Sequence, residues 1–189
     1  MFIETEATPN PATLKFLPGR PVLENSTRDF RSIHDAAISP LARELFEIDG
    51  IRGVYFGSDF ISVTKAQNEE WQHLKPAILG TIMDHYLSGR PLLEQAEGEH
   101  ESNEEFFNEK DADTVATIKE LIETRVRPAV AGDGGDITFK GYRDGIVYLS
   151  MRGACAGCPS STMTLKNGIE NLLRHFLPDV QGVEAVNPS

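Results

Sequence analysis

The residues best equipped for chemistry are two cysteines that stand three positions apart, Cys155 and Cys158, in the run Cys-Ala-Gly-Cys. The chain has no other cysteine. Thiolates are both nucleophiles and metal ligands, so this pair can bind a metal or cycle through a disulfide. A pair of small buried apolar side chains is the structural alternative. A structural disulfide is disfavoured because it would close a very short loop.

The flanking residues predict that both thiols lie where a strand turns into a helix. A strand is expected over residues 146–151, and Pro159 is suited to the first turn of a helix expected over residues 159–176. Unpaired N–H groups at a helix start favour thiolate over thiol. Gly153 and Gly157 carry no side chain, so a bulky inorganic group or a second chain can approach the backbone there.

Two thiolates leave a metal site incomplete, because tetrahedral zinc and the common iron-sulfur clusters take about four ligands. His175 cannot complete it, since it stands at the far end of the following helix, roughly 25 Å away at 1.5 Å per residue. A second copy of the chain, related by a twofold axis, would supply two more thiolates. A zinc-linked structural dimer would satisfy the same ligand count. A thioredoxin-like thiol-disulfide oxidoreductase is the other alternative, although only one short strand follows the helix.

Composition limits the other kinds of partner. Of the 189 residues, 40% are hydrophobic and 25% are charged, which suits a globular protein with its own core. The net charge of −11 argues against nucleic-acid binding, which needs a basic face. No apolar run is long enough to cross a membrane, and the first residues lack the features of a signal peptide. We therefore expect a cytoplasmic protein with no nucleic-acid or membrane partner.

An acidic stretch divides the chain. Residues 94–111 hold eight acids against one lysine, which is −7 of the total charge. Such a segment favours a flexible linker. We expect an N-terminal domain over residues 1–90, an acidic linker over 91–111 and a C-terminal domain over 112–189.

Both domains are predicted to be of the α+β class, as small sandwich-like units. In the first, strands are expected over residues 2–6, 13–17, 51–56 and 60–64, with helices over 40–48 and 71–87. Its histidines, His34, His73 and His85, lack metal-ligand spacing, and no catalytic constellation is present. The sequence therefore predicts a protein that is not an enzyme.

The second domain is predicted to have the order α-β-β-α-β. A helix over residues 112–127 is expected to end at Pro128, and a loop over 132–136 to lead into strands over 137–142 and 146–151. The helix over 159–176 and a strand over 180–186 complete it. Asp133 and Asp136 in the loop lack the ligand spacing of a calcium site, so a turn is the favoured interpretation.

Several motifs resemble the NifU-like (Nfu) family. The C-terminal half resembles the NifU C-terminal domain in three stretches: Asp133-Gly134-Gly135-Asp136, Gly153-Ala154-Cys155-Ala156-Gly157-Cys158-Pro159-Ser160-Ser161 and Leu165-Lys166-Asn167-Gly168-Ile169-Glu170. The first half resembles the Nfu N-terminal domain in Phe2-Ile3-Glu4-Thr5, Thr8-Pro9-Asn10-Pro11, Leu14-Lys15-Phe16, Ser39-Pro40-Leu41-Ala42 and Phe56-Gly57-Ser58-Asp59-Phe60-Ile61. The resemblance covers nearly the whole chain except the linker.

This resemblance implies an iron-sulfur cluster carrier or scaffold. A 4Fe-4S cluster would bridge two subunits through Cys155 and Cys158 and pass to apo-proteins such as lipoyl synthase or aconitase-type enzymes. Upstream assembly proteins would supply the cluster. The resemblance also implies a late-acting carrier. The longer nitrogen-fixation NifU has further cysteine-bearing domains that this chain lacks, which argues against a complete scaffold role. Its location would be the bacterial cytoplasm, or the mitochondrial matrix for a processed eukaryotic chain.

Overall fold

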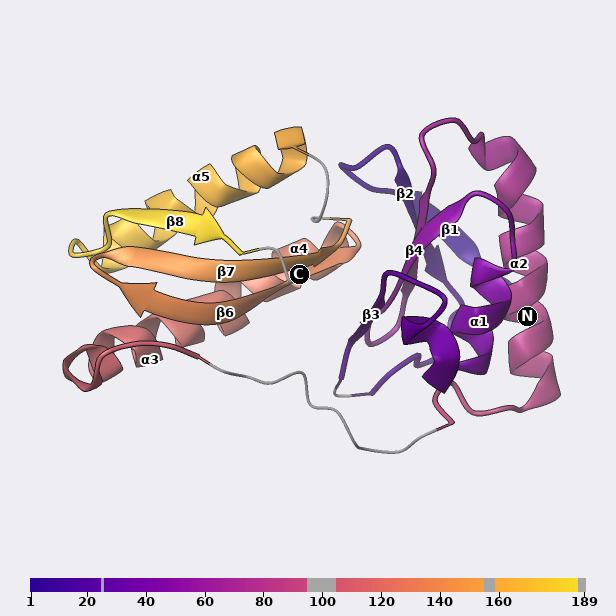
Figure 1. Cartoon of the computed structure of the whole chain (residues 1–189), viewed down its shortest axis with the longest axis horizontal. Helices are drawn as coiled ribbons and strands as arrows, with labels where there is room; N and C mark the ends of the chain where they lie inside the picture. Colours follow the sequence, from indigo (N-terminus) through magenta and orange to yellow (C-terminus); the bar gives the residue numbers. More distant parts are fainter. Residues whose placement is uncertain (25, 95–104, 155–158, 187–189) are drawn as a thin grey trace. The chain divides into compact units, whose positions relative to one another are not determined.

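The computed structural model describes residues 1–24, 26–94, 105–154 and 159–186, with the side chains of residues 159–162 left aside. The chain forms two compact units, Met1–Gly98 and Glu99–Ser189. Each unit combines helices with one sheet (Figure 1), which confirms the predicted α+β class. The exact limits of the acidic linker, residues 91–111, stay a prediction.

The N-terminal unit is an antiparallel sheet with helices packed on one face (Figure 1). The spatial order of its strands is β1-β2-β5-β4-β3. The strands are β1 (Glu4–Ala7), β2 (Thr13–Leu17), β3 (Arg28–Phe30), β4 (Ile51–Phe56) and β5 (Ile61–Lys65). The helices are the 3-10 turn η1 (Asp35–Ile38), α1 (Pro40–Phe46) and α2 (Trp71–Ser88).

Local signals explain where the two α-helices of this unit begin and end. The Ser39 hydroxyl accepts a hydrogen bond from the Ala42 N–H at 3.2 Å, and Pro40 occupies the first turn of α1. Gly89 follows α2 in the left-handed conformation, with φ of 68°. These helix boundaries confirm the sequence prediction to within about two residues. The strand β3 was not predicted, because three residues with only Phe30 buried show no alternation.

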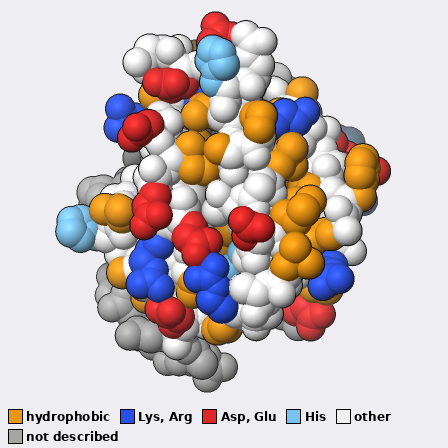
Figure 2. All heavy atoms as spheres, turned by 90° about the vertical axis from the view of Figure 1, so that its right-hand side faces the viewer, with side chains coloured by type: hydrophobic (Ala, Val, Ile, Leu, Met, Phe, Trp, Pro, Cys, Tyr) orange, Lys and Arg blue, Asp and Glu red, His pale blue; other side chains and the backbone are white. Residues whose placement is uncertain are grey.

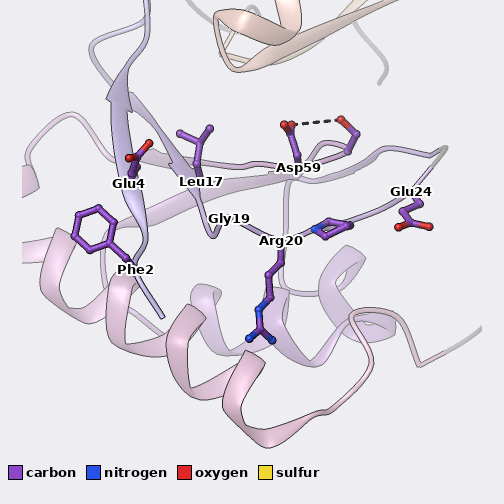
Figure 3. A pocket seen from close by; sticks show the side chains of 9 residues that line it. Phe2, Glu4, Leu17, Gly19, Arg20, Glu24 and Asp59 are labelled. Carbon is purple, nitrogen blue, oxygen red and sulfur yellow. Dashed lines mark hydrogen bonds between the residues drawn. The ribbon is translucent and has the colours of Figure 1, made fainter.

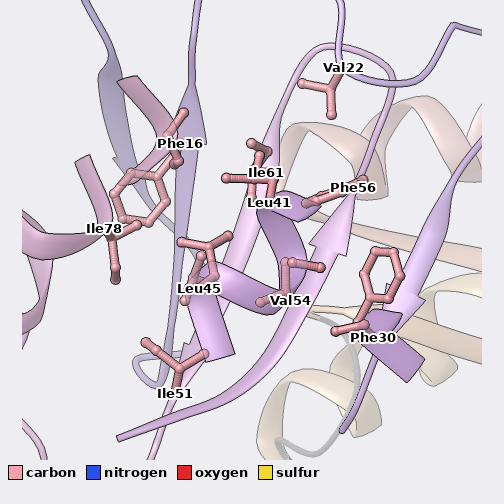
Figure 4. Close-up of a cluster of buried hydrophobic side chains, with 14 of the residues drawn as sticks. Phe16, Val22, Phe30, Leu41, Leu45, Ile51, Val54, Phe56, Ile61 and Ile78 are labelled. Carbon is pink, nitrogen blue, oxygen red and sulfur yellow. The ribbon is translucent and has the colours of Figure 1, made fainter. Parts of the chain in front are cut away.

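The hydrophobic core lies between the sheet and the two helices (Figure 4). Phe30 and Phe56 meet edge to face there, with ring centroids 5.1 Å apart. On β2, Phe16 belongs to this core and is fully buried. Because side chains alternate along a strand, Lys15 and Leu17 point to the other face of the sheet.

One ionisable group, His85 on α2, is buried in this unit. Its side chain is 1% exposed, and neither ring nitrogen has a hydrogen-bond partner in the described part of the chain. Desolvation lowers the pKa of His85 and the nearby Arg90 lowers it further, while Glu44 opposes them. The histidine is thus a structural residue that is held neutral.

This burial predicts that acid destabilises the N-terminal unit. The unfolded chain protonates His85 near its ordinary pKa of about 6.5, whereas the folded chain resists protonation. Stability should therefore fall as the pH drops below about 6.5, by up to about 1.4 kcal/mol per pH unit from this group. Urea unfolding at pH 7.5 and 5.5, followed by fluorescence of the single tryptophan, Trp71, measures the loss.

The matched variants for this prediction are His85→Phe and His73→Phe, which change a buried and an exposed histidine of the same helix. His85→Phe should flatten the pH dependence, and His73→Phe should leave it as in the wild type. An unchanged pH dependence in His85→Phe would contradict the assignment.

The C-terminal unit has the predicted order α-β-β-α-β. Its first helical region joins α3 (Ala112–Leu121), the π-helical segment η3 (Ile122–Val126) and α4 (Arg127–Gly132), after a 3-10 turn η2 (Glu109–Asp111). The strands β6 (Gly135–Arg143) and β7 (Ile146–Gly153) form an antiparallel hairpin, and β8 (Gly182–Ala185) pairs in parallel with β7. The last helix, α5 (Pro159–Phe176), has the bounds predicted from the sequence.

Two predictions about the start of this unit are wrong. The first helical region does not end at Pro128, which instead lies in the first turn of α4. A proline there loses no needed N–H donor, and the wider π-helical turn before it gives the chain room for the ring. The loop predicted over residues 132–136 is shorter, because Gly132 ends α4 and β6 begins at Gly135.

The chain just before η2 is attached to the sheet of this unit. Phe106 donates its N–H to the Lys140 carbonyl at 3.1 Å and accepts from the Tyr142 N–H at 2.9 Å. Its ring lies over Gly141, where a Cβ atom would come within 2.5 Å of the ring. The end of the acidic stretch is therefore part of the C-terminal unit, and Gly141 leaves the room that this packing needs.

Candidate functional site

The candidate site is the connection between β7 and α5. The structure describes β7 as far as Gly153 and α5 from Pro159, so the flanking strand and helix are those expected from the sequence. The predicted ligands themselves, Cys155 and Cys158, lie outside the described residues. The geometry available for the site is therefore that of its two ends.

The first end of the connection is held by backbone contacts. Gly153 has φ of 61°, in the left-handed region that favours glycine. The next residue, Ala154, is 2% exposed and donates its N–H to the Gly134 carbonyl at 3.2 Å. Gly134 itself has φ of 80°, and Gly135 pairs with Gly153 in the β6-β7 register. The glycine-rich turn before β6 thus supports the strand end that leads into the cysteines.

An ion pair stabilises this glycine-rich turn. The Arg127 guanidinium donates from Nε to Oδ1 of Asp136 at 2.9 Å and from Nη2 to Oδ2 at 3.1 Å, and it also contacts Glu123. The Asp136 carboxylate further accepts from the Ile137 N–H at 2.8 Å. This hydrogen bonding with Asp136 raises the pKa of Arg127 despite its partial burial. The contacts join the start of α4 to the start of β6.

These contacts decide the role of the two aspartates in the predicted loop. Asp136 is buried and paired with Arg127, whereas Asp133 is exposed in the turn. Among the described residues, no group of three or more His, Cys, Asp or Glu side chains is arranged to hold a metal ion. The turn interpretation agrees with the structure at Asp133, whereas Asp136 lies in β6.

Sequence reasoning missed the part played by Arg127 and Arg152. Arg152 is buried and stands opposite Asp136 in the β6-β7 register, so both side chains face the same side of the sheet. Two arginines thus lie beside one buried carboxylate. Arg152 stands three residues before Cys155 in the sequence. The two arginines are far from Asp136 in the sequence, so no local sequence pattern predicts that they lie beside it. The one available signal is Asp136 itself, because aspartate is uncommon in strands.

Of the described histidines, His175 alone belongs to the unit that holds this site. His175 lies exposed near the end of α5, with its ring 5.1 Å from that of Phe176. His34 and His73 are exposed in the N-terminal unit, and His85 is buried in its core. None of them joins a metal-binding group among the described residues.

Comparison with family models assigns both halves of the chain. Residues 3–89 match the model described as "Scaffold protein Nfu/NifU N terminal", and residues 118–184 match the NifU-like domain. The chain belongs to the Nfu family. Both cysteines fall inside the second matched region. Neither the oxidoreductase nor the zinc-linked alternative is favoured by these matches.

Curated relatives extend the similarity over almost the whole chain. The mitochondrial NFU1 iron-sulfur cluster scaffold homolog of Homo sapiens is 52% identical over 187 residues, covering 98% of this chain and 72% of its own length. The mitochondrial NifU-like protein 4 of Arabidopsis thaliana is 50% identical, over 97% of this chain and 65% of its own. This Nfu chain therefore spans about two thirds of the length of these relatives.

The similarity of this chain to solved structures is weaker. The solution structure of a NifU-like protein from Saccharomyces cerevisiae covers 51% of this chain and 87% of its own, with a TM-score of 0.47 and 24% identity. The family assignment rests on the sequence matches. Within the described residues, no helix is both long enough and apolar enough to span a membrane.

Proposed function

We propose that this Nfu protein carries a 4Fe-4S cluster between two subunits and delivers it to apo-proteins. The cluster is its cargo, and Cys155 and Cys158 of each chain are the ligands. One observation supports this most strongly: the NifU-like domain match contains both of the chain's cysteines, and one chain has only two. Four thiolates therefore require two chains.

The ends of the site suit a cluster that must later leave. The Ala154 hydrogen bond and the Gly153 turn hold the strand end in place. Pro159 begins a helix of 18 residues, whose first N–H groups can hydrogen-bond to thiolate or sulfide. A cluster that bridges two subunits would also be accessible to partner proteins from one side. Such access suits a cluster that is transferred better than a cluster that stays bound as an electron-transfer centre.

The partners of such a carrier are upstream assembly proteins and apo iron-sulfur proteins. We propose lipoyl synthase and aconitase-type enzymes as receivers, because they hold 4Fe-4S clusters of the same type. The relatives named above are mitochondrial, so we propose the mitochondrial matrix as the location if this chain has a eukaryotic origin and the bacterial cytoplasm otherwise. The protein itself catalyses no reaction in this scheme.

Transfer to an apo aconitase-type enzyme tests the carrier function. The loaded protein should restore aconitase activity faster than the same amounts of free iron and sulfide, and a membrane-impermeant iron chelator in solution should not prevent the recovery. Direct transfer keeps iron away from the chelator, because the cluster passes between thiolates within a complex. Recovery that the chelator abolishes would show release followed by reassembly and would contradict a carrier.

A further inference from the structure

A hollow of about 840 Å³ lies at one end of the N-terminal sheet (Figure 3). Three segments form it: the chain entering β1, the end of β2 with the loop after it, and the β4-β5 turn. Its lining consists of Phe2, Glu4, Leu17, Gly19, Arg20, Pro21, Glu24, Ser58 and Asp59. Apolar side chains thus share the hollow with three carboxylates.

The walls of the hollow are held in place by backbone hydrogen bonds. The Val22 N–H donates to the Ser58 carbonyl at 2.8 Å, and the Leu23 N–H donates to the Gly57 carbonyl at 3.2 Å. These bonds fix the loop after β2 against the β4-β5 turn. The site is therefore preformed, and a ligand would not have to order this loop.

The charge inside the hollow is acidic. Glu4 and Leu17 are register partners and point to the same side of the sheet (Figure 3). Arg20, the one cation of the lining, extends toward α2 in that view, and its charge acts on Tyr86 of that helix. Glu4 makes no ion pair with any described residue. The hollow therefore presents uncompensated carboxylates beside an apolar floor.

The edge of the sheet continues this surface. β1 is an outer strand, paired on one side with β2 and on its other side with no described strand. Unpaired backbone groups of an edge strand accept an added strand from a partner. Phe2, which is 79% exposed, lies two residues before Glu4, so the side chains of Phe2, Glu4 and Glu6 follow one another on one side of the chain. Glu6 is paired with Lys15 of β2 at 3.2 Å, so Glu4 is the carboxylate of β1 that is open to a partner.

The helix-covered side of the unit has no comparable excess of acidic side chains among its described residues. On the helix-covered side, acidic and basic side chains lie next to one another (Figure 2), and ion pairs such as Arg43–Glu94 and Arg90–Glu44 neutralise them. A partner guided by charge would therefore meet the sheet end at β1.

We propose that β1 and the hollow bind an extended basic segment of another protein by strand addition. The segment would carry a Lys or Arg residue opposite Glu4 and a large apolar side chain in the hollow against Phe2 and Leu17. Opposite charges directly across a strand pair are favourable, and like charges are not. A second copy of β1 would bring further acidic side chains, Glu4 and Glu6, to this edge, so charge complementarity favours a basic partner over self-pairing.

A palindromic peptide, Leu-Thr-Lys-Thr-Lys-Thr-Leu, is a probe that fits either strand direction. A peptide of the same composition in the order Lys-Lys-Leu-Leu-Thr-Thr-Thr is its control. Titration of the iron-free full chain, followed by amide NMR signals, should shift residues 2–7 and 17–24 and the β4-β5 turn. The palindromic peptide should bind at least about tenfold more tightly than the control, which corresponds to about 1.4 kcal/mol.

Two surface variants test the contacts. Glu4→Lys and Phe2→Ser should each weaken binding about tenfold or more, whereas Glu120→Lys and Phe107→Ser, which change exposed residues of the other unit, should leave it unchanged. Trp71 fluorescence checks that the variants stay folded. Equal binding of both peptides, binding unaffected by Glu4→Lys, or a dimer formed through β1 without peptide would each overturn the proposal. The iron-free protein is used, so this result is independent of cluster binding.

Discussion

Cys155→Ala is expected to abolish cluster binding completely. The variant leaves one thiolate per chain, so a dimer would offer two ligands where a 4Fe-4S cluster takes four. After anaerobic treatment with iron and sulfide, the visible absorbance of the cluster should be absent. The mass in solution should stay that of the iron-free protein, because the bridging group is lost.

The fold should survive this substitution. The substitution leaves the sequence of β7, of α5 and of the described core cluster of the C-terminal unit unchanged. Asn167→Ala, a change of an exposed residue of α5, is the matched control and should bind the cluster as the wild type does. A Cys155→Ala protein that still bound four irons per dimer would show that other ligands hold the cluster.

Asp136→Ala is expected to destabilise the C-terminal unit by about 2–3 kcal/mol. Breaking a buried ion pair costs about 3–5 kcal/mol because a charge is left unpaired. The figure here is reduced because the Arg127 side chain is 34% exposed and water can solvate it. Removal of the Asp136 carboxylate, whose side chain is 7% exposed, also leaves the Ile137 N–H without this acceptor.

Urea unfolding followed by the amide signals of Ile137 and Leu149 measures this effect within the C-terminal unit. Asp133→Ala, at an exposed aspartate of the same turn, should cost less than about 0.5 kcal/mol. A double variant, Arg127→Leu with Asp136→Leu, should be less destabilised than the sum of its single changes, since neither member of the Arg127–Asp136 pair is left without the other. Additive effects would show that the two residues do not act as a pair.

The same substitution should also affect the cargo. The Arg127–Asp136 pair supports the turn whose Gly134 carbonyl holds Ala154, the residue just before Cys155. Loosening that turn should speed the loss of cluster to a chelator in Asp136→Ala compared with Asp133→Ala.

Local signals predicted the helices and strands where they were strong. Pro159 and the apolar spacing up to Phe176 were enough to place α5, and Ser39 with Pro40 placed the start of α1. Pro128 misled the prediction because a π-helical turn, which no residue pattern announced, accommodates its ring. A proline therefore ends a helix only where the backbone around it cannot make room for its ring.

Contacts between distant residues could not be predicted in this way. The pairing of Arg127 with Asp136 and the packing of Phe106 over Gly141 depend on the register of β6, which the sequence indicates only as a hairpin. The candidate ligands, in contrast, followed from the spacing of the two cysteines alone. The number of chains in the site followed from the ligand count, and it stays a prediction.

The most direct test of the central claim is the stoichiometry of the reconstituted protein. Anaerobic loading with iron and sulfide, combined with metal analysis and mass measurement in solution, should give a brown dimer with about two irons and two sulfides per chain. That ratio means one 4Fe-4S cluster shared by two chains. A colourless protein that held half a zinc ion per chain, or a monomer that retained a complete cluster, would contradict it.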